Sequence, residues 1–409
     1  MSREQSAFRV AWGAVAITTS TVLPVFLAGA LTVQVSAELG FSPAGLGVAV
    51  ALYFGVSALV SLPVGKIVEH LGSRRTSRIA VLGASTFMLL TAAFARNYTS
   101  FLVILLCGAW CNVMGQLSSN LTLARSMPAE RMGFSFGAKQ ASVPLATLLA
   151  GAAVPAVGLT IGWRWAYVIG AALALTSLAA APHGSGAGSR ERKVAENRAT
   201  AALSVIGAAA GLGAAAANAL GIFLVASAVD RGVDPGLAGL VLTLGSAVGL
   251  VMRMVHGWLA DRRSGGHIAV VAGCFLLGAG GLALLAAPGP VCLIAGTVLG
   301  FGLGWSWPGL LQFAVVRLNP SAPASATAII QAGVYAGGFA GPIGFGFLAT
   351  HGSFSLAWLV GAVAMLLSGL GVLAGRRMLL AHRARTAEVG SDSGVPQPVS
   401  GGLPRDADS

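Results

Sequence analysis

The chain has 409 residues, of which 56% are hydrophobic and only 9% charged, and its formal net charge is +12. This composition excludes an ordinary soluble globular protein. The charges fall in short gaps between apolar runs and form no aromatic-laced basic patch, which excludes a nucleic-acid-binding protein.

Apolar runs of about twenty residues, without strand-like alternation, predict membrane-spanning helices, because hydrocarbon offers the backbone no hydrogen-bond partner. Arg3 and Arg9 precede the first run, but that run is too long for the core of a signal peptide. A polar, Gly- and Ser-rich stretch at 183–200 separates six runs from six. The predicted spans are 12–36, 43–68, 77–95, 99–125, 134–158, 162–181, 201–228, 236–259, 267–286, 291–317, 325–349 and 354–375.

The chain therefore divides into an N-terminal six-helix bundle (1–182), a linker (183–200), a C-terminal six-helix bundle (201–376) and a tail (377–409) predicted to be disordered. With the N-terminus in the cytoplasm, twenty Lys and Arg residues lie on the cytoplasmic side. Only Arg96, Arg164 and Arg231 lie outside. The positive-inside rule then places both termini and the linker in the cytoplasm of a multi-pass plasma-membrane protein.

The two halves of the chain are internal copies. A shift of 192 residues pairs Gly65 with Gly257 and Glu69 with Asp261, inside two charged stretches that follow the second and eighth spans. The same shift pairs Gly40, Pro43, Gly47, Arg125 and Pro128 with Gly232, Pro235, Gly239, Arg317 and Pro320, and a shift of 191 pairs Gln140 with Gln331. Each copy has an even number of spans, so both enter the membrane in the same direction.

Twelve helices in two copies, a basic linker and a charged gap after the second helix of each copy resemble the major facilitator superfamily. Its signature G-x-x-x-D-(R/K)-x-G-x-R-(R/K) is matched, with substitutions, at Gly65, Glu69, Gly72, Arg74 and Arg75, and more loosely at Gly257, Asp261 and Arg262. The resemblance implies that these residues, together with Arg125, form a gate. It also implies a secondary transporter with alternating access, coupled to a proton or counter-ion and working as a monomer in the lipid bilayer.

Two departures from the family pattern bear on the substrate. The fourth helix has no Arg before its end, and the fifth keeps only Gly151, Pro155 and Gly158 of the drug-antiporter signature. The stretch GAKQASVPLATLLAG is similar to permeases of the cyanate type, which move small anions. We therefore expect a small-anion transporter, with a drug or metabolite efflux antiporter as the alternative.

Polar residues inside spans are costly and point to a cavity or to an interhelical bond. Asn112, Gln116 and Asn120 share one helical face, as do Thr327, Gln331 and Tyr335. For the hydroxyl groups the alternative is a bond to their own helix, and for the tryptophans it is packing. The further cavity candidates are Thr18, Thr21, Gln140, Asn218, Trp305 and Trp307.

Charge inside the spans is entirely basic. The acidic residues all fall in predicted loops, ends or tails, whereas Lys139 and Arg253 lie within spans. An anion pathway suits this distribution, and the alternative is that both side chains snorkel to a nearby membrane surface. His256, one turn from Arg253, is either a proton carrier or a packed histidine.

Other classes of protein have less support. A membrane-embedded enzyme needs acidic, His or Cys clusters at membrane depth, and a channel does not require the fused repeat. No P-loop is present, the four cysteines have no metal-site spacing, and we expect no cofactor, no metal site and no enzymatic activity.

Overall fold

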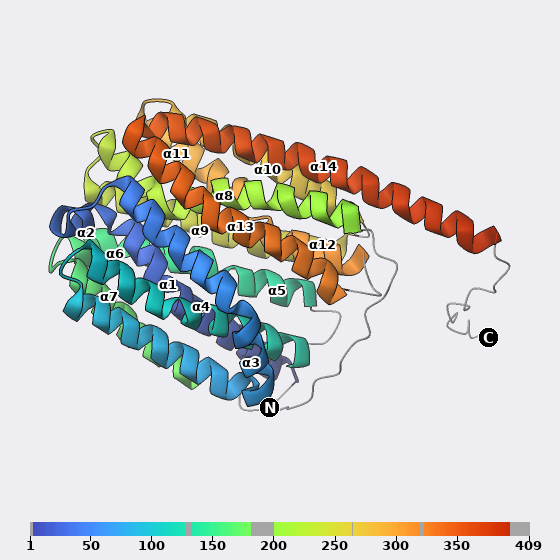
Figure 1. The fold of residues 1–409 in the computed structure, drawn as a ribbon, viewed down its shortest axis with the longest axis horizontal. Coiled ribbons are helices and arrows are strands. Elements are labelled where there is room, and N and C mark those ends of the chain that lie inside the picture. Colours follow the sequence, from blue (N-terminus) through green and yellow to red (C-terminus); the bar gives the residue numbers. More distant parts are fainter. Residues whose placement is uncertain (1–2, 127–131, 181–199, 264, 319–322, 393–409) are drawn as a thin grey trace, which may run out of the picture.

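The computed structural model describes residues 3–126, 132–180, 200–263, 265–318 and 323–392, and within these ranges every regular element is helical. Figure 1 shows the helices running alongside one another, with α14 reaching beyond the others. The first half contains α1 (Arg3–Ala30), α2 (Thr32–Leu39), α3 (Pro43–Phe94), α4 (Tyr98–Ser126), α5 (Met132–Gln140), α6 (Ser142–Ala153), η2 (Val154–Gly158), α7 (Trp163–Thr176) and η3 (Ser177–Ala180).

The second half repeats this arrangement of spans. It contains α8 (Thr200–Asp230), α9 (Pro235–Arg262), α10 (His267–Ala286), α11 (Pro290–Leu299), η4 (Gly300–Gly304), α12 (Pro308–Leu318), α13 (Pro323–His351) and α14 (Phe354–Asp392). Eleven helices in the described part of the chain are long and apolar enough to cross a membrane. The predicted sixth span consists of α7 followed by the 3₁₀ turn η3, each too short alone. The all-helical fold of two six-helix bundles predicted from the sequence is confirmed.

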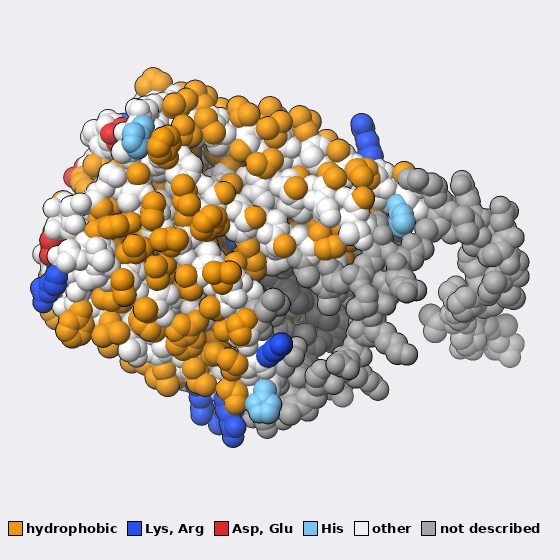
Figure 2. Space-filling view, in the orientation of Figure 1, with side chains coloured by type: hydrophobic (Ala, Val, Ile, Leu, Met, Phe, Trp, Pro, Cys, Tyr) orange, Lys and Arg blue, Asp and Glu red, His pale blue; other side chains and the backbone are white. Residues whose placement is uncertain are grey.

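We call the end of the bundles where the linker segment 181–199 attaches the linker end, and the other end the opposite end. The linker end holds the start of α1, the end of η3, the start of α8 and the end of α14; the opposite end holds the connections near residues 40, 96, 160, 232, 288 and 352. Hydrophobic side chains cover most of the face in Figure 2, and most of the charged ones lie towards its two ends. Leu59, Leu277 and Val363 are among the large hydrophobic side chains exposed on the molecule. Such a surface is suited to lipid rather than water.

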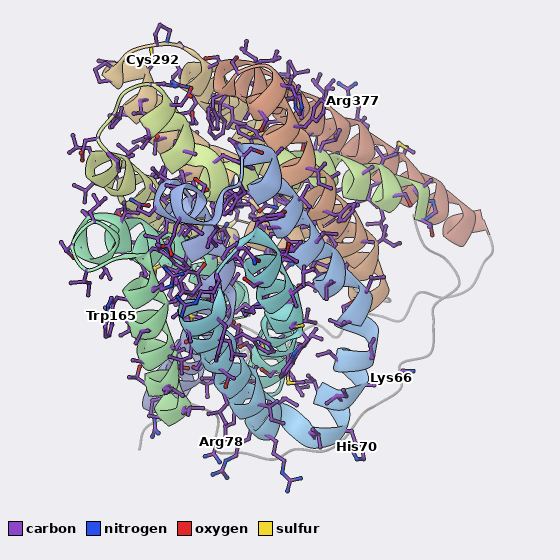
Figure 3. The ribbon with its side chains drawn as sticks, turned by 60° about the vertical axis from the view of Figure 1, so that its left-hand side comes forward. Lys66, His70, Arg78, Trp165, Cys292 and Arg377 are labelled. Carbon is purple, nitrogen blue, oxygen red and sulfur yellow. The ribbon has the colours of Figure 1, made fainter. Side chains whose placement is uncertain are left out.

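The second and third spans are joined almost without a loop. Both belong to α3, which is interrupted at Gly72, where φ is 77° and ψ is 163°. Only glycine adopts this conformation without strain, so the motif glycine forms the turn itself. Figure 3 shows Lys66, His70 and Arg78 around this turn at the linker end.

The predicted disorder of the tail from residue 377 is wrong for its first part, because α14 continues to Asp392. The segment after Arg377 is rich in Ala, Leu and Arg and lacks Pro, and these residues favour a helix even outside the membrane. Residues 393–409 lie outside the described part of the chain.

Small residues allow the closest helix crossings. A Cβ atom at Gly333 or Gly337 of α13 would overlap the backbone of Gly207 or Gly211 in α8. The Gly-rich stretch 337–346 of α13 is therefore a packing surface in this protein.

Candidate functional site

The two bundles meet along two seams that the internal repeat relates to each other. In the first seam α3 packs against α13, and in the second seam α5 and α6 pack against α9. Between them α1 packs against α8, where a Cβ at Gly29 would lie 2.8 Å from the Cα of Ile222. Substrate sites in repeats of this kind lie at the interface between the halves.

Both seams are closed at the opposite end by equivalent glycines. A Cβ at Gly47 would overlap the carbonyl oxygen of Pro342, and one at Gly239 would lie 2.7 Å from the carbonyl oxygen of Gly151. The shift of 192 pairs Gly47 with Gly239, and the shift of 191 pairs Gly151 with Pro342. The first seam also has a hydrogen bond of 2.9 Å from the Ala44 amide to Thr350 Oγ1.

At the linker end the two seams differ. In the second seam a Cβ at Gly137 would lie 3.2 Å from the Cα of Gly257, so α5 and α9 touch. In the first seam, a Cβ at the equivalent Gly65 would meet, among the described residues, only Leu117 of α4, at 3.9 Å. The ribbons of α3 and α13 accordingly diverge towards the linker end in Figure 1.

The second copy of the charged motif stabilises the closed seam. Asp261 Oδ2 accepts a hydrogen bond of 3.0 Å from the amide of Phe134, in the first turn of α5. Amide groups in a first helical turn lack intrahelical partners, and the positive end of the helix dipole favours the carboxylate. Arg262 lies over the ring of Trp258 at 4.0 Å instead of entering the seam.

A chain of amide side chains crosses from one bundle to the other. Gln140 Nε2 of α5 donates to Gln312 Oε1 of α12 at 3.3 Å, and Gln312 Nε2 donates to Gln331 Oε1 of α13 at 3.2 Å. Tyr335 lies one turn from Gln331, on the same face of α13. Gln331 lies eight residues from the start of α13, about 12 Å from the linker end at 1.5 Å per residue. The candidate span in α13 begins at Ile329, so the chain lies near the linker end of the membrane-spanning region.

Of the two span cations, Arg253 bonds to the backbone of this chain, and Lys139 bonds to a separate amide side chain in the first bundle. Lys139 Nζ donates to Gln116 Oε1 of α4. Arg253 donates to the carbonyl oxygen of Gln140 through Nη1 and to that of Trp305 through Nη2, at 2.7 Å for the latter. Each residue is only 4% exposed, which excludes the snorkelling interpretation. In the described part of the chain neither cation contacts a carboxylate.

A cavity of about 10 Å³ lies beside these groups, between the bundles. This volume is close to the minimum that holds one water molecule. It is lined by Gly137, Gln140, Arg253, Gly257, Ala260, Ser306, Gly309, Leu310 and Phe313.

Other predicted residues have structural partners near the interface. Thr18 Oγ1 donates to Ser119 Oγ at 3.1 Å, joining α1 to α4. Thr21 Oγ1 donates to its own helix, at 3.1 Å to the Ile17 carbonyl, as the alternative interpretation predicted. The ring of Trp305 lies 5.8 Å from that of Phe26 in α1, so Trp305 is part of the interface between halves.

Trp307 and His256 face the inside of the second bundle. The Trp307 ring lies 4.8 Å from that of Phe275 in α10, and His256 Nε2 lies 3.9 Å from Cys274 Sγ. Both observations favour packing over a role in the pathway. Asn112 is buried with Oδ1 unpaired among the described residues, while Asn120 and Asn218 are half-buried.

Three predicted side chains, those of Glu69, Arg125 and Thr327, lie outside what the structure describes. Arg74 and Arg75 are exposed. Sequence reasoning missed Phe134 and the hydrogen bond between Ser246 Oγ and Thr147 Oγ1, 2.7 Å long, across the second seam. A backbone amide has no sequence signal, and neither hydroxyl shares a motif with its partner.

A separate charged cluster joins two helices of the first bundle at the opposite end. Glu38 accepts hydrogen bonds from Arg164 Nη1 at 2.5 Å and from Trp163 Nε1 at 2.7 Å. These bonds, that from Arg164 above all, lower the pKa of the Glu38 carboxyl. The cluster joins α2 to α7 and does not touch the interface between bundles.

The sequence matches the Major Facilitator Superfamily over residues 11–185 and 206–401, one segment in each bundle. The chain belongs to the Major Facilitator Superfamily. As a superfamily member, it is a membrane transporter of a small solute in a lipid bilayer.

A solved superfamily structure has the same fold. It is the crystal structure of a bacterial homolog of the human lysosomal transporter Spinster, in an inward-facing and occupied conformation. The TM-score is 0.64 at 14% sequence identity, over 92% of this chain and 96% of that chain. At this identity the likeness extends to the fold alone.

Proposed function

We propose that the protein is a secondary transporter of a small organic or inorganic anion. The observation that carries the proposal is the pair of buried cations, Lys139 and Arg253, which hydrogen-bond only to neutral oxygens in the described part of the chain. Arg253 bonds across the interface to Gln140, and Lys139, the neighbour of Gln140 in the chain, bonds to the amide side chain of Gln116. A small anion is the counter-charge that this arrangement lacks.

The physical argument is the cost of an unpaired buried charge. Removing an ion from water costs several kcal/mol even after relaxation, and a nearby opposite charge offsets that cost. Lys139 and Arg253 also lie close enough to repel each other electrostatically. An anion between them relieves both penalties, whereas a cationic drug would add to them. This favours anion transport over the alternative of drug efflux.

The proposed mechanism is alternating access between bundles 1–182 and 201–376. The distribution of basic residues supports a plasma-membrane protein with its linker end and both termini in the cytoplasm. The opposite end is closed at Gly47 and Gly239, and among the described residues Gly65 has no contact across the first seam, so we assign the structure to an inward-facing state. Rocking that closes α3 on α13 at the linker end would expose the site to the outside, in a monomer.

Uptake by proteoliposomes tests this function. A panel of small anions is screened first by thermal shift of the purified protein, and the stabilising anions are then measured as saturable counterflow, with and without a pH gradient to detect proton coupling. We expect Lys139→Gln and Arg253→Gln to lower the initial rate at least tenfold, because each removes one charge from the site.

Arg377→Gln is the matched control, since Arg377 is an exposed cation of α14 at the linker end. Its rate should equal that of the wild type. Stabilisation by lipophilic cations alone, or unchanged anion uptake in folded Lys139→Gln and Arg253→Gln, would overturn the anion assignment. A linear, non-saturating current would overturn the carrier mechanism.

A further inference from the structure

A second polar site lies away from the interface between bundles. A groove of about 310 Å³ opens at the linker end of the second bundle, where the start of α10, the end of α12 and α14 meet. It is lined by Gly265, Gly266, His267, Ile268, Ala314, Arg317, Leu318, Arg376, Leu379 and Leu380. One part of this lining is cationic or polar, another part is aliphatic, and no carboxylate is included.

His267 provides the observation that points to a ligand. The residue is only 6% exposed, and its buried Nε2 atom has no hydrogen-bond partner among the described residues. The ring is held by an edge contact with Phe313, at 5.3 Å between centroids. A buried polar atom without a partner is costly, so a group that bonds Nε2 from the groove would be stabilised there.

Positive charge reaches the groove from three helices. His267 is the first residue of α10, whose N-cap Gly266 provides no side-chain acceptor, so the positive end of this helix faces the groove. Arg317 comes from α12 and Arg376 from α14. Arg317 Nη1 donates to the Arg263 carbonyl oxygen at 3.2 Å, which holds the guanidinium near the start of α10.

The groove lies where the second copy of the charged motif departs from the first. The shift of 192 pairs Arg74 and Arg75 with Gly266 and His267. Arg75 is exposed at the turn of α3, whereas His267 is buried. Replacing a long exposed cation pair by glycine and an inward-facing imidazole leaves room for a bound group at this corner of the bundle.

We propose that this groove binds a phosphate-bearing anion, namely the headgroup of an anionic phospholipid. The phosphate accepts from His267 Nε2 and pairs with Arg317 and Arg376, and the acyl chains extend from it into the bilayer, away from Leu318, Leu379 and Leu380 at the linker end. Cationic pockets at the ends of membrane helices bind acidic headgroups in this manner. A free phosphate shares the headgroup chemistry but has no acyl chain to hold it at the membrane.

Titration of purified full-length protein in neutral detergent tests the site, with thermal unfolding as the readout. The probes are dioctanoyl phosphatidic acid, dioctanoyl phosphatidylcholine and inorganic phosphate. We expect phosphatidic acid to stabilise the wild type, and Arg317→Gln and Arg376→Gln each to weaken its binding about fivefold. His267→Phe should weaken it as well, and phosphatidylcholine should have little effect.

Arg377→Gln is again the control, because Arg377 adjoins Arg376 but does not line the groove. Equal weakening in Arg377→Gln and Arg376→Gln would show non-specific attraction and overturn the site, as would the absence of any effect of phosphatidic acid. Stabilisation by inorganic phosphate at the same concentration, with the same dependence on Arg317 and Arg376, would overturn the lipid and leave a soluble phosphate as the ligand. Because none of these readouts is transport, the outcome is independent of the proposed function.

Discussion

The first seam and the second seam are built from equivalent segments of the two repeats, but they are packed differently. At the opposite end the backbones touch in both, at Gly47 with Pro342 and at Gly239 with Gly151. Towards the linker end the second seam remains closed, at Gly137 with Gly257, whereas the described residues of the first seam show no such contact at Gly65. The repeat therefore supplies two similar surfaces, and the protein holds them in different states at the same time.

The chemistry of the two seams explains this difference. The second seam has polar bonds along its length, from Thr147 and Ser246 to Arg253 and Asp261. Among the described residues, the contacts of the first seam are mostly apolar or backbone contacts, such as that between Gly55 and the Phe339 ring. Apolar contacts have little direction and resist sliding less than oriented hydrogen bonds do. We infer that the first seam opens more readily towards the linker end.

The largest expected effect comes from the glycines that close the opposite end. Gly47→Val and Gly239→Val place side-chain atoms against backbone, and overpacking of this kind costs about 1–3 kcal/mol or more. Closure of the opposite end should fail, and transport in proteoliposomes should fall at least tenfold for either variant. Gly344→Val is the matched control on α13, since a Cβ at Gly344 meets no atom within 4 Å. Near-normal transport by Gly47→Val would show that the contact is not a gate.

A smaller effect is expected at Asp261. Asp261→Asn keeps an acceptor for the Phe134 amide but removes the charge at the start of α5, an interaction worth about 0.3–1 kcal/mol. The balance between states should shift twofold to fivefold towards an open second seam, and the initial rate should change while substrate preference does not. Glu38→Gln, which removes a carboxylate inside one bundle, should leave the rate unchanged. Altered selectivity in Asp261→Asn would count against a purely gating role.

The smallest effect is expected for the hydroxyl pair in the second seam. Ser246→Ala removes the bond to Thr147 and should lower the free energy of unfolding by about 0.5–1.5 kcal/mol. Ser57→Ala removes a bond of similar type, 3.3 Å long to the Ala109 carbonyl, within the first bundle. Both variants should melt earlier, but only Ser246→Ala should also change the transport rate. If the two variants transport at equal rates, the hydrogen bond between Ser246 and Thr147 has no role in the conformational change at the second seam.

Much of the fold was predictable, because membrane helices are encoded locally. Runs of apolar residues and the repeat indicate the spans, and the charged motif indicates the gap between the second and third spans, but not that Gly72 alone turns the chain. The helix beyond Arg377 is not indicated by the sequence, because few large apolar residues follow Leu380. Helix propensity without apolar periodicity predicts a helix only weakly, yet the segment up to Asp392 is helical.

The candidate site was predictable only as a set of residue types. Lys139, Arg253, Gln116 and Gln331 are candidates because they lie inside predicted spans, where polar groups need partners. Which groups bond to each other depends on how two distant helices face one another, as with Gln140 and Gln312. Backbone partners such as the Trp305 carbonyl leave no trace in residue identity. The closing of one seam and the opening of the other likewise depends on packing between halves.

The single-residue turn at Gly72 has a mechanical consequence. A connection of one residue has no slack, so the two segments of α3 on either side of it cannot tilt independently by more than that residue's dihedral angles permit. The segment that meets α13 must carry the following segment with it, and α4 and α7 pack against this same helix. Movement at the first seam is therefore transmitted as the swing of a stiff pair of helices, and the rest of the bundle moves with them.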